Sequence, residues 1–141
     1  MDDLNKFLDV NEKSRKIKHE RYPVTQQQID EILENELKDY NFPVKPVYNP
    51  RIKVNGRTKG EIYKWGQLKR IISIEIGKQD SPIKNFLIDT ILHEYLEAKI
   101  MIKQYTDSFY EKLSKSSDNN RHKWIYDQIE KFFRKMEGDK K

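Results

Sequence analysis

Three ionisable residues stand close together in the most apolar stretch of the sequence. His93, Glu94 and Glu97 occur in the run ILHEYLEAKI. In a helix, His93 and Glu97 lie one turn apart on the same face, so an imidazole and a carboxylate could bind one metal ion. Glu94 is rotated from His93 by about 100° and could take a proton from a water molecule that the ion activates. The spacing therefore predicts a metal-binding helix that carries its own general base.

A zinc ion at a catalytic site takes three protein ligands and leaves a further position for water. The other histidines are His19, in a polar N-terminal stretch, and His122, at the start of an amphipathic segment that must pack on the same core. We therefore predict one Zn²⁺ ion bound by His93, Glu97 and His122, a variant of the H-E-x-x-H arrangement. The alternatives are a hydrogen-bonded polar pair in the core and an ordinary surface histidine at position 122.

The composition bounds the class of protein. The chain has 141 residues, of which 36% are charged and 35% hydrophobic, and its mean hydropathy is −0.98. Such a chain accommodates one domain with a core and excludes a membrane protein. It has no cysteine, which excludes disulfides and thiolate chemistry and fits a cytoplasmic location. We predict a loosely ordered segment over residues 1–22, one domain over 23–137 and a disordered tail over 138–141.

The first half of that domain contains one helix followed by strands. Thr25 and Gln28 form a capping box that predicts a helix from Gln26 to Tyr40. An extended run from Val44 leads to a turn at Asn55-Gly56, and the segments 58–65 and 69–76 follow as strands. Three antiparallel strands are the simplest account of this pattern.

The second half is helical. Ser81 as N-cap and Pro82 at the first position predict a helix that is apolar on nearly all sides to Ile102, which is typical of a buried central helix. A short helix at 109–113, a polar loop at 114–120 and a closing helix from Arg121 to Met136 follow. The fold class expected is α+β.

Several local features resemble the SprT-like and YgjP-like zinc metallopeptidases, which are small gluzincin-type zincins. The segment Lys64-Trp65-Gly66 resembles a basic-Trp-Gly turn of the YgjP-like branch, FLIDTILHEYLEA resembles its helix leading into HELAH, and NRHKW at 120–124 resembles the segment with the third ligand. The resemblance covers roughly residues 44–133 and extends to small phage-encoded proteins with an HExxEA helix. It implies a zincin-like domain in which His93 and His122 bind zinc and Glu94 is the base. Glu97 departs from the family, which has histidine there.

These observations predict a zinc-dependent metallopeptidase that hydrolyses peptide bonds of a protein or peptide substrate. Substrate backbone would add to the edge of the strand at 69–76, at Ile72, Ser73 and Ile74. Tyr95 and Tyr105 are candidate transition-state donors, with ordinary packing as the alternative. The other reading is a non-catalytic, zincin-like accessory protein of phage or mobile-element type that binds a metal, a protein or a nucleic acid.

The charge distribution raises a second possibility for partners. Residues 44–78 contain nine Lys or Arg and two Glu, a local charge of +7. Together with Trp65, Tyr48 and Tyr63 as stacking residues, this region could contact nucleic acid weakly. The alternative is that lysines on exposed strands prevent edge-to-edge pairing. No membrane contact is expected.

Overall fold

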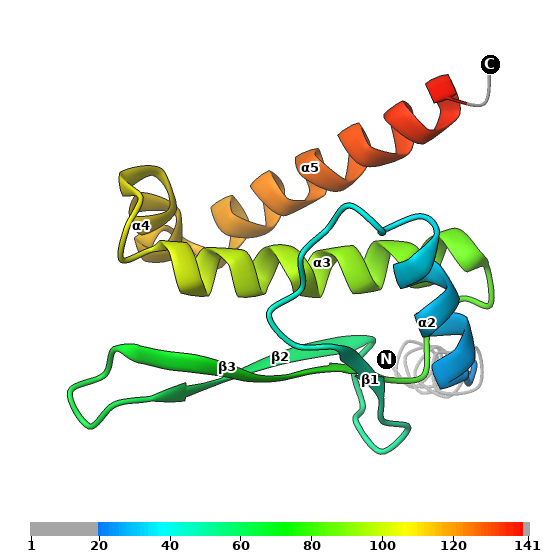
Figure 1. Ribbon diagram of the computed structural model, residues 1–141, viewed down its shortest axis with the longest axis horizontal. Helices are drawn as coiled ribbons and strands as arrows, with labels where there is room; N and C mark the ends of the chain where they lie inside the picture. Colours follow the sequence, from blue (N-terminus) through cyan, green and yellow to red (C-terminus); the bar gives the residue numbers. More distant parts are fainter. Residues whose placement is uncertain (1–19, 140–141) are drawn as a thin grey trace, which may run out of the picture.

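The computed structural model describes residues 20–139, and these form the α+β fold that the sequence predicts. A mixed sheet forms one layer, the long helix α3 (Lys84–Lys103) lies across one of its faces, and α5 (Asp118–Asp139) crosses on the far side of α3 (Figure 1). The helix α2 (Gln26–Glu34) lies beside the start of α3. His93, Glu94 and Glu97 therefore lie on the helix that both the sheet and α5 contact.

Helix α2 begins as predicted and ends early. Thr25 accepts from the backbone N–H of Gln28, and the Gln28 side chain accepts from the backbone N–H of Thr25, so both halves of the capping box are present. The predicted extension to Tyr40 is wrong, because the chain turns after Glu34. The turn places Leu37 in the core, where it is 1% exposed, and pairs Glu36 with Lys84. These contacts replace the missing helical turn.

The sheet contains β1 (Pro46–Tyr48), β2 (Gly56–Ile62) and β3 (Leu68–Ile76) in the order β1-β3-β2. The prediction of an all-antiparallel sheet is wrong for β1, which pairs in parallel with β3, whereas β2 pairs with β3 antiparallel. The only hairpin among residues 20–139 joins β2 to β3.

The turn predicted at Asn55-Gly56 does not form a hairpin. The Asn55 side chain instead donates to the Asp80 carboxylate and accepts from the Asp80 backbone N–H, which ties this point to the segment after β3. Val44 to Val54 contributes only the three residues of β1 to the sheet. Long-range hydrogen bonds therefore override the local turn preference.

Helix α3 starts later than Ser81 and Pro82 predict. Its N-cap is Ile83, whose side chain makes no capping hydrogen bond. The Ser81 hydroxyl accepts from the backbone N–H of Ile83 itself, and so caps no residue inside the helix. The helix is central and largely buried as expected, although Ile102 near its end is 42% exposed.

The C-terminal helices are longer than the sequence predicts. Helix α4 spans Ser108–Lys115, with Asp107 as its N-cap, and α5 begins at Asp118, so most of the predicted loop at 114–120 is helical. Helix α5 continues to Asp139, and the tail predicted from residue 138 is therefore wrong for its first two residues. The rest of that tail and residues 1–19 of the predicted N-terminal segment lie outside the described residues.

One hydrophobic core joins the layers. Isoleucines dominate it: Ile29 and Ile32 come from α2, Ile74 and Ile76 from β3, Ile88 and Ile91 from α3, and Ile125 and Ile129 from α5. Each of these side chains is at most 3% exposed. Tyr22 is joined to the same domain by a pair of backbone hydrogen bonds with Gln79.

Candidate metal centre

His93, Glu97 and His122 lie together where α3 meets the start of α5. One ligand atom of each lies within 4.8 Å of the others, and all three side chains are partly buried. The His122 Nε2 to Glu97 Oε1 distance is 3.9 Å, and the imidazole centroids of His93 and His122 are 5.4 Å apart. The structure thus brings together the three residues that the sequence predicts as metal ligands.

The arrangement fits a metal ion of the expected class. Two imidazoles and one carboxylate are a donor set that zinc accepts at catalytic sites, with a position left for water. Ligand atoms about 2.1 Å from a tetrahedral zinc ion lie roughly 3.4 Å apart. The pair Glu97 and His122, at 3.9 Å, is therefore about half an ångström wider than a bound ion requires, and the other pairs lie within 4.8 Å. Side-chain rotation can close such a gap.

Burial also prepares His93 for this role. The pKa of His93 is lowered, mainly because the surrounding protein removes water from the imidazole, although the nearby Glu97 carboxylate opposes this effect. A neutral imidazole keeps a lone pair available for a metal ion.

A further residue, Arg121, contacts the cluster and was not predicted from the sequence. Its Nε donates to Glu97 Oε1 over 3.2 Å, and its Nη1 lies 2.9 Å from Asp118 Oδ1. It directly precedes His122 in the sequence, but no local pattern indicates that it contacts Glu97 on α3. Glu97 therefore faces an arginine and a histidine together.

Glu94 lies on the side of α3 that faces the sheet. It is only 8% exposed, and the Thr58 hydroxyl on β2 lies 3.0 Å from its Oε1 and 3.1 Å from its backbone carbonyl oxygen. Burial raises the pKa of the Glu94 carboxyl to about 7, against the effect of the Thr58 hydrogen bond, and the Glu97 charge raises it further. A carboxyl with such a pKa can both accept and donate a proton near neutral pH.

A glycine permits this close approach of strand and helix. A Cβ atom on Gly56 would lie 2.8 Å from Glu94 Cγ and 3.0 Å from both Glu94 Oε2 and Thr90 Cγ2. Only a residue without a side chain leaves Glu94 in its present position.

A buried glutamine, Gln79, holds the segment before β2 against α3. Gln79 is fully buried, and its side-chain amide donates to the backbone carbonyls of Asn55 and Gly77, each over 2.8 Å. Its carbonyl oxygen accepts from the Thr90 hydroxyl over 2.6 Å. This network joins the start of β2 to α3 one turn before Glu94.

A cavity of about 350 Å³ opens beside the cluster, with His93 and Glu94 in its wall. Asn55 and Gly56 line it from the sheet side, and Tyr126 lines it from α5. Asp89, one turn before His93, also borders this cavity, and burial raises the pKa of its carboxyl. The cavity is the space that a substrate group could enter next to the proposed ligands.

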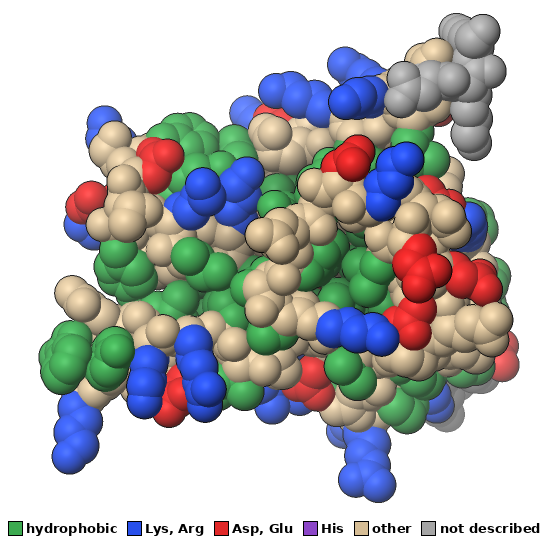
Figure 2. All heavy atoms as spheres, in the orientation of Figure 1, with side chains coloured by type: hydrophobic (Ala, Val, Ile, Leu, Met, Phe, Trp, Pro, Cys, Tyr) green, Lys and Arg blue, Asp and Glu red, His purple; other side chains and the backbone are tan. Residues whose placement is uncertain are grey.

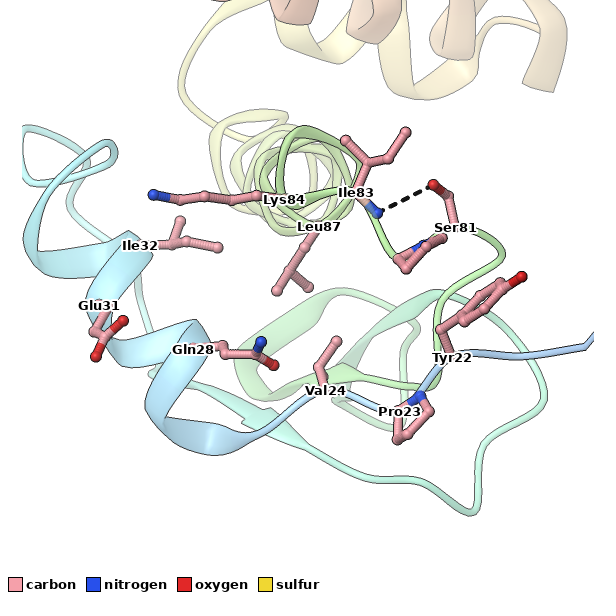
Figure 3. A pocket seen from close by; sticks show the side chains of 11 residues that line it. Tyr22, Pro23, Val24, Gln28, Glu31, Ile32, Ser81, Ile83, Lys84 and Leu87 are labelled. Atoms are coloured by element: carbon pink, nitrogen blue, oxygen red, sulfur yellow. Dashed lines mark hydrogen bonds between the residues drawn. The ribbon is translucent and has the colours of Figure 1, made fainter.

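A larger cavity, of about 420 Å³, lies away from this region, between α2 and the start of α3 (Figure 3). Val24, Ile32 and Leu87 are among the side chains around it, and Glu31 and Lys84 are its charged ones. None of the three proposed metal ligands borders it. It therefore adds nothing to the candidate centre.

The structure separates both tyrosines proposed as transition-state donors from the cluster. Tyr95 packs with Tyr40 and Phe42, at centroid distances of 5.1 and 4.9 Å, and Tyr105 accepts a hydrogen bond from the backbone of Leu68. The tyrosine beside the imidazoles is Tyr126, whose ring centroid is 5.8 Å from that of His93. It lies one helical turn after His122, a spacing that could have identified it.

The substrate-binding edge predicted at Ile72, Ser73 and Ile74 is wrong for Ile74, where β3 is covered on both sides, whereas Ile72 and Ser73 have no partner in β1. Ile74 pairs with residues of both β1 and β2, and its side chain is fully buried. Within residues 20–139, β2 is an edge strand, and it is the strand that contacts Glu94.

Comparison with protein-family models, curated proteins and solved structures gives no match to this chain. Within the part of the chain that the structure describes, no helix is both long enough and apolar enough to span a bilayer.

Proposed function

We propose that this protein is a zinc-dependent metallopeptidase whose ligands are His93, Glu97 and His122. The observation that supports this proposal is the convergence of these ligand atoms within 4.8 Å, beside the protonatable carboxyl of Glu94. The resemblance of the HExxE helix to zincin sequences agrees with it. A bound zinc ion would supply Lewis-acid chemistry, by polarising a peptide carbonyl and lowering the pKa of water.

The residues of the chain have separate tasks in this proposal. His93 offers a neutral imidazole, and Glu97 and His122 complete the donor set. Glu94 takes a proton from the attacking water at its carboxylate and later delivers one to the leaving amine. Thr58 holds the Glu94 carboxyl toward β2 by the hydrogen bond to Oε1.

The substrate would be a peptide or an extended segment of a protein. β2 has an open edge within the described part of the chain, and its first residue borders the cavity beside His93. An extended substrate can add to such an edge through main-chain hydrogen bonds, while one side chain enters the cavity. Recognition would then depend more on an extended conformation than on sequence.

The test separates metal binding from catalysis. The protein is loaded with Zn²⁺, passed through a desalting column and analysed for metal by mass spectrometry, and hydrolysis of fluorescein-labelled casein is measured in parallel. We expect one zinc ion per chain for the parent and for Glu94→Gln, and loss of zinc for His122→Ala and His93→Ala. Hydrolysis should fall about 100-fold or more in Glu94→Gln. A parent that retains no zinc, or a Glu94→Gln variant that cleaves at the parent rate, would contradict the proposal.

A second candidate is a zinc-binding protein without catalysis, and the Arg121 contact favours it. The guanidinium lies on the same Glu97 oxygen that faces His122, so Glu97 is partly neutralised before any ion binds. Stoichiometric zinc without hydrolysis of casein or of a random peptide library would support this candidate over the peptidase.

A further inference from the structure

The hairpin formed by β2 and β3 extends beyond the end of α3 (Figure 1). Its turn is closed by a hydrogen bond from the Tyr63 N–H to the Gln67 carbonyl, and Gly66 takes the positive φ of 94° that this turn needs. The Tyr105 hydroxyl, at the end of α3, accepts from the Leu68 N–H over 2.7 Å. The hairpin is therefore held to the end of α3 at Leu68, directly after the turn.

Two aromatic side chains are stacked at this tip. The rings of Tyr63 and Trp65 lie 4.6 Å apart between centroids and are nearly parallel, with an interplanar angle of 8°. Trp65 is 71% exposed, and neither residue belongs to the core cluster. Figure 2 shows an apolar knob at the corner where the hairpin ends, with Lys and Arg side chains beside it. Such exposure of a rigid aromatic pair is typical of a binding surface.

The hairpin is also cationic after its internal ion pairs are counted. Residues 56–76 contain five Lys or Arg and two Glu. Glu61 pairs with Arg70 and Lys69, and Glu75 pairs with Arg57 and Lys59, so both acids are already compensated. Lys64, between the stacked aromatics, makes no ion pair within the described residues. The surface carries a net positive charge on each side of the aromatic pair.

We propose that this hairpin binds single-stranded nucleic acid. Tyr63 covers one face of the Trp65 ring, and a base stacks on the other face. The lysines contact neighbouring phosphates. An unpaired base is required, because a duplex buries its base faces in its own stack. The partner is a polyanion because the hairpin is cationic, and it has planar groups because the pair at the tip offers a stacking platform. This binding does not depend on the metallopeptidase proposal.

The test uses tryptophan emission and a labelled oligonucleotide. The chain has two tryptophans, so Trp124→Phe leaves Trp65 as the sole reporter. We expect a twelve-residue oligothymidylate to quench Trp65, while polyphosphate of about equal charge does not. In the parent protein, anisotropy of the labelled oligonucleotide should give an affinity that falls steeply with salt.

Variants separate stacking from charge. Trp65→Ala should weaken oligothymidylate binding about tenfold, and Trp65→Phe should retain most of it. Lys64→Gln should reduce the slope of log affinity against log salt by about 0.7, the value for one phosphate of a single strand. The matched controls are Phe109→Ala and Lys112→Gln on α4, which should leave binding unchanged.

Three outcomes would overturn the proposal. The first is no oligonucleotide binding at low salt. The second is equal affinity for polyphosphate together with no effect of Trp65→Ala, which would identify a plain cationic surface that also suits an acidic protein. The third is tighter binding to a duplex than to the single strand.

Discussion

Arg121 donates through Nε to Oε1 of Glu97, across the junction of α5 and α3, over 3.2 Å. The same carboxylate oxygen lies 3.9 Å from His122 Nε2. A metal ion that uses Glu97 must therefore share this carboxylate with a guanidinium, and its charge would lie close to a cation. Under the proposed function, Arg121 would influence metal affinity without being a ligand.

Arg121→Gln should tighten zinc binding several-fold, because it removes both the competitor for Glu97 and a nearby positive charge. The affinity is measured by competition with a chromophoric chelator. Arg134→Gln is a matched control on the same helix, where Arg134 pairs with Glu130. Weaker zinc binding in Arg121→Gln would show instead that the guanidinium orients Glu97 for the metal.

Gly56→Ala should destabilise the fold by roughly 1–3 kcal/mol, since the added Cβ would overlap Glu94 and Thr90 and force them to move. Chemical denaturation measures the free energy of unfolding, and metal content should remain at the parent level because no ligand is touched. Gly138→Ala is the control: a Cβ there meets no atom within 4 Å, and the substitution in α5 should be neutral or slightly stabilising. Equal effects of the two substitutions would argue against a tight contact at Gly56.

Glu94→Gln should remove part of the pH dependence of stability in the metal-free protein. The pKa of Glu94 rises from 4.5 to about 7 in the fold, so the folded state binds a proton more tightly than the unfolded state. The stability from this proton is fully present below pH 4.5 and is lost as the pH rises through 7. At about 1.4 kcal/mol per pKa unit, the loss is on the order of 3 kcal/mol.

Glutamine does not ionise, so the free energy of unfolding of the variant should rise relative to that of the parent as the pH increases from 4.5 to 7. Urea denaturation in the presence of a chelator measures this difference. The exposed Glu130 provides the control, as Glu130→Gln should leave the slope unchanged. Parallel stability profiles for the parent and Glu94→Gln would contradict a strongly raised pKa.

Gln79→Leu should destabilise the protein by about 3 kcal/mol, because it removes three hydrogen bonds and leaves the Gly77 carbonyl and the Thr90 hydroxyl without the partner that Gln79 provides. The Asn55 carbonyl still accepts from the Gly77 backbone N–H. Thermal and urea unfolding measure the loss. In the double variant with Thr90→Val, the further cost should be less than that of Thr90→Val alone, since the two side chains share one hydrogen bond. Additive costs would show that the Gln79 to Thr90 bond contributes little.

The sequence by itself determined the long buried helix and the residues on its polar positions. The spacing of His93 and Glu97 is local, so a regular helix places them on one face wherever it lies. His122 could be added because α5 carries an apolar stripe that must pack on the same core. The capping box at Thr25 was equally local, and the structure confirms it.

Only the tertiary structure decided the order of the strands, the edge that is open and the partners of Glu97 and Glu94. β1 pairs with β3 rather than β2, and Asn55 is held by Asp80, a contact between residues 25 positions apart. Arg121 and Thr58 come from separate elements, and no local pattern connects them to α3. Such contacts depend on how the layers pack. The packing of the whole core decides which side chains from different elements come within hydrogen-bond distance, and residues adjacent in sequence do not.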